Sequence, residues 1–515
     1  WLLQNYGTDT DAAYLVNNRQ MWFIPVVNPD GYCYNESLYR PGPPVYFGSW
    51  RKNRRNNGGS YGVDLNRNYG TYEMWNGPNG GSSTYPSDDT YRGPEPFSEP
   101  ETFAIDEFMW SHNIQTCLNY HTYGNYLIFP WGYLTTETDD SLNFREFAFD
   151  MVSENRYTTG TDQQTVNYST RGNSDDFMYS GTMTRTYAMT PEVGTSGFWP
   201  PTNEILPLAI KNLSANRYLS YVAGQYTILK RIEINDPDND GQLTSGEIFT
   251  LSTTIRNKGL KDAENLTVTI SSSLPGVTFG INTITLSSML ARSDSTVNFS
   301  GMVKPDCPMT SAVNFYFTFT STYGYFHRDT ASTIIGSPII LLDDSANTGT
   351  GNWNIEGTWG ITSNSHTPPY SFTESPSGYY SGSAHNFLTL SAPLDLTNYD
   401  FCTLKFWTKW AIEPTTDFAK IEVSSNNGST WKSLRSKLSR PGSGYGIQYS
   451  GTWGYDGYTP GRDWVEQEID LSQFKNQLIL LRFSLISDGS DNRDGCYIDD
   501  IRIVAYRPPV SILRL

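Results

Sequence analysis

A cluster of basic side chains stands out in a chain that is otherwise acidic. Residues 49–68 read SWRKNRRNNGGSYGVDLNRN, with three Arg and one Lys at positions 51–55 and Arg67 shortly after. The whole chain has 36 basic and 53 acidic side chains and a formal net charge of −17. Because the planar guanidinium of Arg binds a carboxylate through two parallel hydrogen bonds, this segment is a candidate for binding a small anionic group.

Two further residues with catalytic chemistry follow predicted strands. His121 ends the apolar stretch IQTCLNYH (114–121), and Glu192 comes just after TRTYAMT (184–190). Ligand sites in open α/β sheets lie outside the carboxyl ends of strands. Imidazole is a common metal ligand and a carboxylate a common general base, so both are candidates. A lone His or Glu at a strand end is more often structural, and position alone does not decide the role.

A third motif indicates a metal-binding loop. The stretch DPDNDGQLTSGE (236–247) fits the pattern D-x-D-x-D-G-x5-E at every position, and oxygen ligands at this spacing favour Ca²⁺ over Zn²⁺. No flanking helices are expected, so a structural Ca²⁺ would brace a domain junction at the entrance to a β-domain. The alternative is a metal-free turn. The candidate ligands are Asp236, Asp238, Asp240, Gln242, Thr244 (through water) and Glu247.

The first part of the chain alternates helix and strand patterns. Residues 21–27 (MWFIPVV) form an apolar run that predicts a buried strand. In FSEPETFAIDEFMW, Ser98 is a candidate N-cap, with Glu101 completing a capping box. Apolar residues at helical spacing predict helices at 144–152 and near 205–213. These patterns predict an α/β sheet with helices on both faces.

From about residue 226 the sequence changes to short alternating segments such as LTVTISS, VNFYFTFTS and LILLRFSLIS, separated by Gly, Asn, Asp, Pro and Ser. Regular short strands with turn residues between them predict β-sandwiches. We therefore expect a multidomain chain, with an α/β domain at 1–225, an Ig-like β-sandwich at 226–338 and a jelly-roll β-sandwich at 339–515. The last part contains DFAKIEVSSNNGSTW (417–431) and CYIDDIRIV (496–504), and through these segments it resembles the jelly-roll modules appended to secreted bacterial peptidases.

Seven short motifs in the first domain occur in an order that carries more information than any one of them. They closely resemble the catalytic domain of zinc carboxypeptidases of the carboxypeptidase A/B/T kind, over residues 1 to about 222. The motifs are NPDGY (28–32), WRKNRR (50–55), GVDLNRN (62–68), PFSEPE (96–101), NYHTYG (119–124), YSTRGNSDDFMY (168–179) and TPEVG (190–194). The resemblance implies a zinc-dependent carboxypeptidase acting on the C-termini of peptides or proteins.

The resemblance also implies roles for single residues. Arg67 with Asn66 would bind the substrate carboxylate, and Arg51 would stabilise the oxyanion formed from the scissile carbonyl. His121 would be one zinc ligand and Glu192 the general base for zinc-activated water. The other basic residues of the cluster, Lys52, Arg54 and Arg55, are expected to be solvated loop residues.

Substrate preference follows from the same motifs. By resemblance, Tyr168 closes over bound substrate, Tyr123 contacts it, and Asp175 lies at the base of the side-chain pocket. A carboxylate there favours C-terminal Lys or Arg, as in B-type enzymes, although T-type relatives with an acidic pocket also accept apolar residues. Arg171 is close enough in sequence to neutralise Asp175 in part.

Two zinc ligands of the family are absent from this sequence. The family supplies them from an HxxE motif, and none of the five His is followed by Glu at the third position. The sequence begins WLLQNYGTD, in the pattern of a helix interior, so we expect an upstream segment that is cleaved, disordered or deleted. An N-terminal fragment carrying HxxE would then be a partner. The alternative function is a catalytically inactive, peptidase-like surface adhesin.

Composition indicates an extracellular protein. Aromatic residues make up 14% of the chain and charged residues 17%, a profile that favours secreted β-rich domains. No apolar run approaches the ~20 residues of a membrane span, and the acidic balance argues against nucleic-acid binding. Exposed Trp and Tyr in the last domain favour glycan or cell-surface binding, although sandwich cores explain them equally well. A second calcium site is a candidate at Asp343, Asp344, Asp499 and Asp500.

Overall fold

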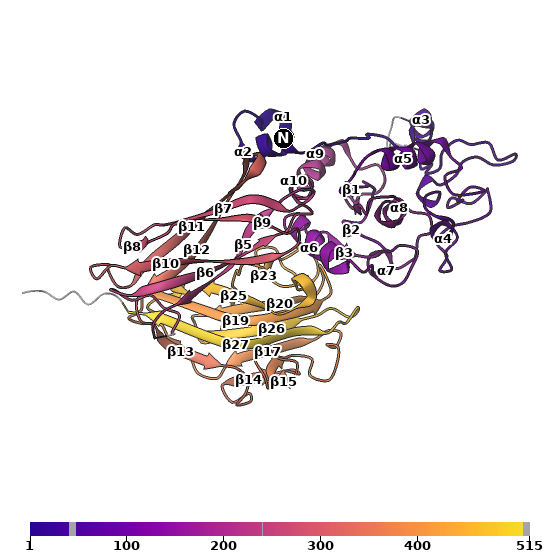
Figure 1. Cartoon of the computed structure of the whole chain (residues 1–515). Coiled ribbons are helices and arrows are strands. Elements are labelled where there is room, and N and C mark those ends of the chain that lie inside the picture. The colour runs from indigo at the N-terminus through magenta and orange to yellow at the C-terminus, as the bar shows by residue number, and fades with distance from the viewer. Residues whose placement is uncertain (41–47, 239, 508–515) are drawn as a thin grey trace, which may run out of the picture. The chain divides into compact units, whose positions relative to one another are not determined.

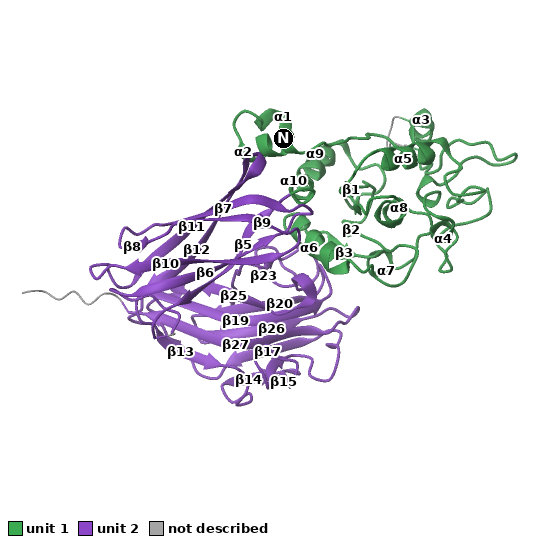
Figure 2. Ribbon diagram, viewed as in Figure 1, with its two compact units in different colours: residues 1–224 green, residues 225–515 purple. Residues whose placement is uncertain are grey.

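The computed structural model describes residues 1–40, 48–238 and 240–507. The chain divides into two compact units, residues 1–224 and 225–515, which Figure 2 shows in different colours. Within the described ranges, no helix is both long and apolar enough to cross a lipid bilayer. The five cysteines are free thiols.

A four-stranded mixed sheet forms the centre of the first unit, in the order β1-β4-β2-β3. Strand β4 is parallel to β1 and antiparallel to β2, and β2 is parallel to β3. Parallel neighbours require crossover connections, which is why helices alternate with strands in this unit. The strands are β1 (Thr116–Leu118), β2 (Tyr126–Ile128), β3 (Thr158–Gly160) and β4 (Tyr187–Glu192).

The helices predicted at 144–152 and near 205–213 form as α6 and α9, but only α6 buries an apolar face, since no residue of α9 is buried. In α6 the residues Phe144, Phe147, Ala148 and Met151 are buried, as their helical spacing requires. The helices are α1 (Leu2–Asn5), α2 (Thr10–Asn18), α3 (Pro29–Ser37), η1 (Leu65–Arg67, 3₁₀), α4 (Tyr72–Trp75), α5 (Pro100–Ser111), α6 (Ser141–Met151), α7 (Asp162–Thr165), α8 (Ser174–Ser180), α9 (Thr202–Lys211) and α10 (Leu213–Val222).

Two local predictions for the first unit are wrong. Residues 21–27 form no strand, and Phe23 is 78% exposed, because no described strand pairs with this run. The N-cap of α5 is Glu99 and not Ser98, and no side chain caps that helix end. Instead, the Ser98 hydroxyl donates to Glu99 Oε1 at 2.8 Å, so tertiary contacts have replaced the local capping box.

In the described part of the second unit, the regular elements are β-strands and three short 3₁₀ turns (Figure 1). Two four-stranded sheets, β5-β6-β10-β8 and β12-β11-β7-β9, contain every strand between residues 227 and 335. Buried residues alternate with half-buried ones along β6, which is typical of a sandwich. The strands are β5 (Thr227–Asn235), β6 (Ile248–Asn257), β7 (Ala263–Ser272), β8 (Val277–Phe279), β9 (Thr283–Met289), β10 (Asp294–Val303), β11 (Ser311–Ser321) and β12 (Tyr325–Ile335).

A seven-stranded and a six-stranded sheet follow, with a small two-stranded ribbon. Trp353, Phe372, Phe406 and Phe483 belong to the core that these sheets enclose. The strands are β13 (Ile339–Asp344), β14 (Trp353–Glu356), β15 (Gly360–Thr362), β16 (Ser371–Thr373), β17 (His385–Leu390), β18 (Leu394–Asp395), β19 (Phe401–Ile412), β20 (Phe418–Ser424), β21 (Lys432–Ser433), β22 (Arg440–Pro441), β23 (Trp453–Gly454), β24 (Gly457–Tyr458), β25 (Val465–Asp470), β26 (Leu478–Ile486) and β27 (Gly495–Tyr506).

Candidate active site

His121 and Glu192 lie side by side at the carboxyl ends of neighbouring parallel strands. They form an isolated parallel bridge, in which the His121 amide donates to Pro191 O and the Val193 amide donates to His121 O, both at 2.9 Å. The bridge continues the pairing of β1 with β4. The fold therefore brings together two residues that are 71 positions apart in the sequence.

The Glu192 carboxyl group is suited to exchanging a proton near neutral pH. Its Oε2 atom is buried, and nothing in the described ranges hydrogen-bonds to it. Burial raises the pKa of Glu192 to about 7; the negative charge of Asp162 raises it further and the positive charge of Arg51 opposes the shift. A general base works best when its pKa is close to the operating pH.

The His121 imidazole is neutral at physiological pH. Burial lowers its pKa to about 4, and the positive charges of Arg67 and Arg51 act in the same direction against the opposing charge of Asp64. A neutral imidazole can donate a lone pair to a metal ion, so His121 fits the role of a zinc ligand. Within the described ranges, no group of three close metal-binding side chains includes His121.

Arg67 is buried and held rigidly in the 3₁₀ turn η1. Its Nε donates to Gly81 O at 2.5 Å and its Nη1 to Asn66 O at 2.7 Å, while only 5% of the residue is exposed. The Asn66 side-chain oxygen accepts a hydrogen bond from the Ser174 amide at 3.0 Å. Among the described residues, nothing accepts a hydrogen bond from Arg67 Nη2, so this donor is available to a ligand.

Arg51 lies close to the same site. Its Nη2 is 2.9 Å from Asp64 Oδ2, and its side chain is 45% exposed. Its charge acts on both His121 and Glu192. The charges of Arg51 and Arg67 thus act on both His121 and Glu192, and Asn66 adjoins Arg67 in the sequence.

The rest of the basic cluster is structural, and the expectation of solvated loop residues is wrong for Lys52. That residue is 2% exposed, and its Nζ donates to Pro86 O and Asp88 O at 3.0 and 2.9 Å. The Arg54 guanidinium lies 3.7 Å from the centre of the Tyr34 ring, a cation–π contact. Lys52 and Arg54 therefore make structural contacts with segments outside the cluster.

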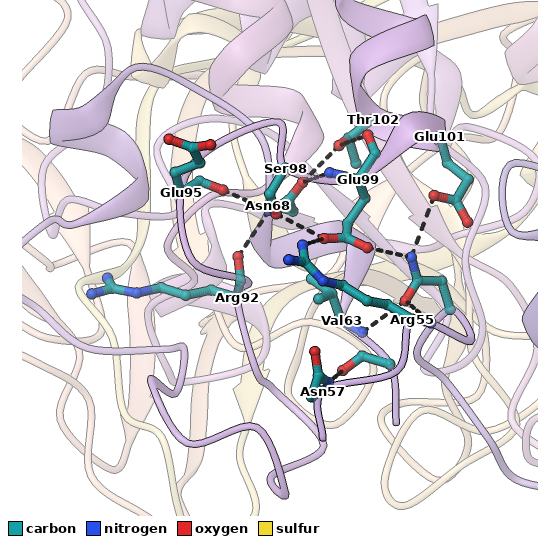
Figure 3. A network of polar contacts seen from close by, with 12 residues as sticks. Arg55, Asn57, Val63, Asn68, Arg92, Glu95, Ser98, Glu99, Glu101 and Thr102 are labelled. Atoms are coloured by element: carbon teal, nitrogen blue, oxygen red, sulfur yellow. Dashed lines mark hydrogen bonds and ion pairs between the residues drawn. The ribbon is translucent and has the colours of Figure 1, made fainter. Parts of the chain in front are cut away.

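Arg55 belongs to a polar network around a buried carboxylate (Figure 3). Glu99 is 1% exposed, and its two oxygens accept from Arg55 Nη1 at 2.6 Å and from Asn53 Nδ2 at 2.7 Å. Asn53 in turn accepts from the Val63 amide at 2.8 Å. The network ties the segment with Arg51 to the segment with Arg67.

Asn68 anchors the other side of this network, and it is wholly buried. Its Nδ2 donates to the Arg92 and Glu95 carbonyls at 2.9 and 3.0 Å, and its Oδ1 accepts from Thr102 Oγ1 at 2.6 Å (Figure 3). Because Asn68 directly follows η1, these bonds fix the position of Arg67.

Asp175 lies in the interior next to the strands of the site. Its two oxygens accept from Asn119 Nδ2 at 2.6 Å and Thr190 Oγ1 at 2.7 Å. Burial raises the pKa of Asp175 to about 7. The expected neutralisation by Arg171 is wrong, because that guanidinium donates to Gly77 O and to the hydroxyl and carbonyl of Ser82.

The two aromatic candidates lie at the surface. Tyr168 is 54% and Tyr123 is 47% exposed, and the Tyr123 ring packs edge-on against Phe198. Asp162 was not predicted, yet its charge acts on Glu192 and Arg67, and burial raises its own pKa to about 6. Thr161 and Gln164 form a capping box at the start of α7 and place Asp162 in the first helical turn. This short motif is the sequence feature that points to Asp162.

Two acidic groups in the second unit also have the geometry of cation sites. The carboxylate oxygens of Asp236, Asp238 and Asp240 lie within 4.8 Å of one another, as the sequence predicts. Glu413, Asp417 and Asp488 form a second such group, which sequence reading missed because its members are up to 75 positions apart.

The second calcium site expected from paired Asp residues is wrong. Each carboxylate has its own partners: Asp344 accepts from Trp353 Nε1 at 2.9 Å, Asp499 from the His366 amide at 2.9 Å, and Asp500 pairs with the His366 ring. Asp343 is 3.8 Å from Arg502 Nε.

Comparison with known proteins identifies the class of the first unit. The family described as "Zinc carboxypeptidase" matches residues 1–215. Carboxypeptidase B of Astacus astacus is 33% identical over 219 residues, which are 39% of this chain and 68% of that protein. Carboxypeptidase A2 of Mus musculus is 33% identical over 217 residues, 40% of this chain and 49% of that protein. The chain belongs to the zinc carboxypeptidase family.

The comparisons confirm the resemblance drawn from the motifs and the predicted fold class. The chain spans about half the length of curated relatives such as the mouse enzyme. The crystal structure of thrombin activatable fibrinolysis inhibitor is 27% identical with a TM-score of 0.37, over 42% of this chain and 55% of that one. In the second unit, the family described as "Immune inhibitor A-like, MAM domain" matches residues 370–506.

Proposed function

We propose that this protein is a secreted carboxypeptidase that removes C-terminal residues from peptides or proteins, with a preference for Lys and Arg. One observation carries the proposal: the charge of Arg67 acts on both His121 and Glu192, which are paired through their main chains. A carboxylate-binding group, a metal ligand and a proton acceptor thus meet in one neighbourhood. This combination suits hydrolysis of the last peptide bond of a substrate.

Each residue of the site has a distinct task in this reaction. Arg67, with its available Nη2 donor, binds the terminal carboxylate, and Arg51 stabilises negative charge that develops on the scissile carbonyl oxygen. Glu192 accepts a proton from the attacking water at Oε2 and delivers it to the leaving nitrogen. A zinc ion held by His121 and two further ligands would act as a Lewis acid. An N-terminal segment carrying HxxE is our candidate source of those two ligands.

Preference for basic C-terminal residues rests on Asp175. A carboxylate in a side-chain pocket pairs with the ammonium of Lys or the guanidinium of Arg. Hydrogen bonds from Asn119 and Thr190 hold this carboxylate in place. Arg171 donates to Gly77 O and does not neutralise the charge of Asp175. Tyr168 and Tyr123, both exposed, are our candidates for contacts with the rest of the substrate.

The test uses the full-length, zinc-loaded protein and peptides ending in Arg, Lys, Phe or Glu. We expect release of C-terminal Arg and Lys to be fastest, loss of activity on chelation, and recovery when zinc is returned. If the zinc-loaded protein releases no C-terminal residue, the proposal fails and the inactive adhesin becomes the better interpretation. The match of the catalytic motifs to active carboxypeptidases favours the enzyme.

Two further expectations concern the second unit. We propose that the loop at 236–247 binds a structural Ca²⁺. Binding of glycans or cell surfaces by the last sandwich stays a prediction from its aromatic content.

A further inference from the structure

The loop between β5 and β6 brings three negative charges close together. Carboxylate oxygens of Asp236, Asp238 and Asp240 lie within 4.8 Å of one another. No described Lys or Arg forms an ion pair with any of them. Gly241 has φ +71°, a left-handed conformation that lets the chain fold back over the three side chains. Three carboxylates this close repel one another unless a cation binds between them.

Asp236 supplies an independent sign of a ligand. The residue is 7% exposed, and its Oδ2 atom is buried without a hydrogen-bond partner among the described residues. Its other oxygen accepts from the Asp240 amide at 3.1 Å, so the side chain points into the loop. A buried carboxylate oxygen left without a partner is costly, and a metal ion bound at that atom removes the cost.

The donor set selects a hard cation. All three side chains offer oxygen, and no His or Cys belongs to the group. Ca²⁺ takes six to eight oxygen ligands in flexible geometry, whereas Mg²⁺ demands a near-ideal octahedron. Glu247, the twelfth position of the motif, accepts from the amide and hydroxyl of Thr244 and lies outside the group of three. The three Asp carboxylates are therefore the core of the site, and other oxygens complete the coordination.

This loop also contacts the end of the last strand of the chain. The main-chain N–H of Gln242 donates to Asp240 Oδ1 at 2.7 Å, and the side-chain oxygen of Gln242 accepts a hydrogen bond from the Tyr506 hydroxyl. Tyr506 ends β27, in the sheet that lies beyond residue 339, and is 4% exposed. Burial raises the pKa of Tyr506 to about 12, and the charge of Asp240 contributes to the shift.

Three more contacts join the same elements. Leu243 bridges Ile335 at the end of β12, and the Gly336 amide donates to Leu243 O at 2.6 Å. On the other side, Thr310 Oγ1 donates to Arg507 O at 2.6 Å. The loop thus connects the sheets at 227–335 with the end of β27, at the position where the chain passes from one set of sheets to the next.

We propose that Asp236, Asp238 and Asp240 bind one Ca²⁺, and that the bound ion fixes the loop so that Gln242 holds Tyr506. The ion would then couple the two sets of sheets in the second unit. This inference is independent of peptidase activity, because no residue of the candidate active site takes part in it.

The binding site is tested on the full chain with Ca²⁺ alone, by isothermal titration calorimetry after chelation. Asp240→Asn removes one charge from an exposed ligand, so the fold is expected to survive. We expect one Ca²⁺ per chain and an affinity at least about tenfold weaker in this variant. Glu264→Gln, which removes one exposed charge from the same sheets, should change the affinity less than about twofold. No binding, or equal affinity in both variants, overturns the site.

The coupling is tested by hydrogen exchange of residues 501–507 with and without Ca²⁺. We expect Ca²⁺ to slow exchange there by at least about threefold in the unaltered protein. Tyr506→Phe removes only the hydroxyl that reaches Gln242, so it should abolish the slowing while Ca²⁺ still binds. If Ca²⁺ binds the unaltered protein without slowing exchange, or slows it equally in Tyr506→Phe, the coupling is wrong.

Discussion

Replacing Asp175 by Asn separates a specificity role from a structural one, because the two roles predict changes of opposite sign. The variant keeps the shape of the side chain and removes its charge. Asn119 can still donate to the remaining oxygen, and the Thr190 hydroxyl can rotate to accept from the new amide. The hydrogen bonds of the site are therefore preserved, and only the buried charge is lost.

Stability should rise in this variant at high pH. The pKa of Asp175 is raised to about 7 in the folded protein, above its ordinary value, so the folded state binds the proton more tightly than the unfolded chain does. Below about pH 4, Asp175 is protonated in both the folded and the unfolded protein and does not lower the free energy of unfolding. Between about pH 4 and 7 the destabilisation by its buried charge grows, and above about pH 7 it is complete. At 1.36 kcal/mol per pKa unit, this pKa shift of Asp175 corresponds to about 4 kcal/mol in the free energy of unfolding.

Activity should change in the other direction. Loss of one partner from a buried charge pair costs about 2–5 kcal/mol, so kcat/KM for peptides ending in Arg or Lys should fall about 30- to 5,000-fold. Peptides ending in Leu should be cleaved at a rate within about threefold of the original, since no charge pair is lost. The assays are peptide hydrolysis at pH 7.5, and thermal unfolding of the first unit between about pH 4 and 9.

The exposed Glu107 provides the control, because Glu107→Gln removes one charge from the same unit without changing the interior. Unchanged hydrolysis of Arg-ending peptides by Asp175→Asn would refute the assignment of this residue to the side-chain pocket. A stability difference that does not grow with pH would refute the buried-charge reasoning.

Three further predictions concern other carboxyl groups. Glu192→Gln should lower kcat about 10²- to 10⁴-fold because it removes the proton acceptor, and should raise the unfolding temperature above about pH 7 because a buried charge is lost; equal turnover would contradict the role. Glu99→Ala should destabilise the first unit by about 3 kcal/mol, since Arg55 and Asn53 lose their buried acceptor; a loss below about 0.5 kcal/mol in denaturant unfolding would contradict this. Burial raises the pKa of Glu374 to about 8, so the stability of the second unit should fall as the pH rises from about 4.5 to 8. Calorimetric unfolding measures this dependence. If Glu374→Gln shows the same slope of unfolding free energy against pH, Glu374 is not the cause.

Several features of the fold could be predicted because their causes are local. The spacing of Phe144, Phe147 and Met151 predicts α6, and the apolar run before Glu192 predicts β4. The Asp spacing at 236–240 predicts a cluster of carboxylates, because residues so close in sequence are brought together by a single turn. The order of seven motifs was sufficient to indicate the family.

Other features depend on which segments become neighbours, and the sequence does not state that. Residues 21–27 have the composition of a buried strand but lack a described pairing partner, so their side chains are exposed. Lys52 reads as a surface charge, yet two carbonyls from residues 34 and 36 positions away satisfy it in the interior.

The site itself shows the same division. The sequence alone was sufficient to propose Arg67, His121 and Glu192 as site residues, since residue type and motif are local properties. Only the tertiary structure decided that His121 and Glu192 pair and that Asp162 lies close enough to raise the pKa of Glu192. The physical reason is that desolvation and charge interactions act through space, across distances that the folded chain sets and its sequence separations do not.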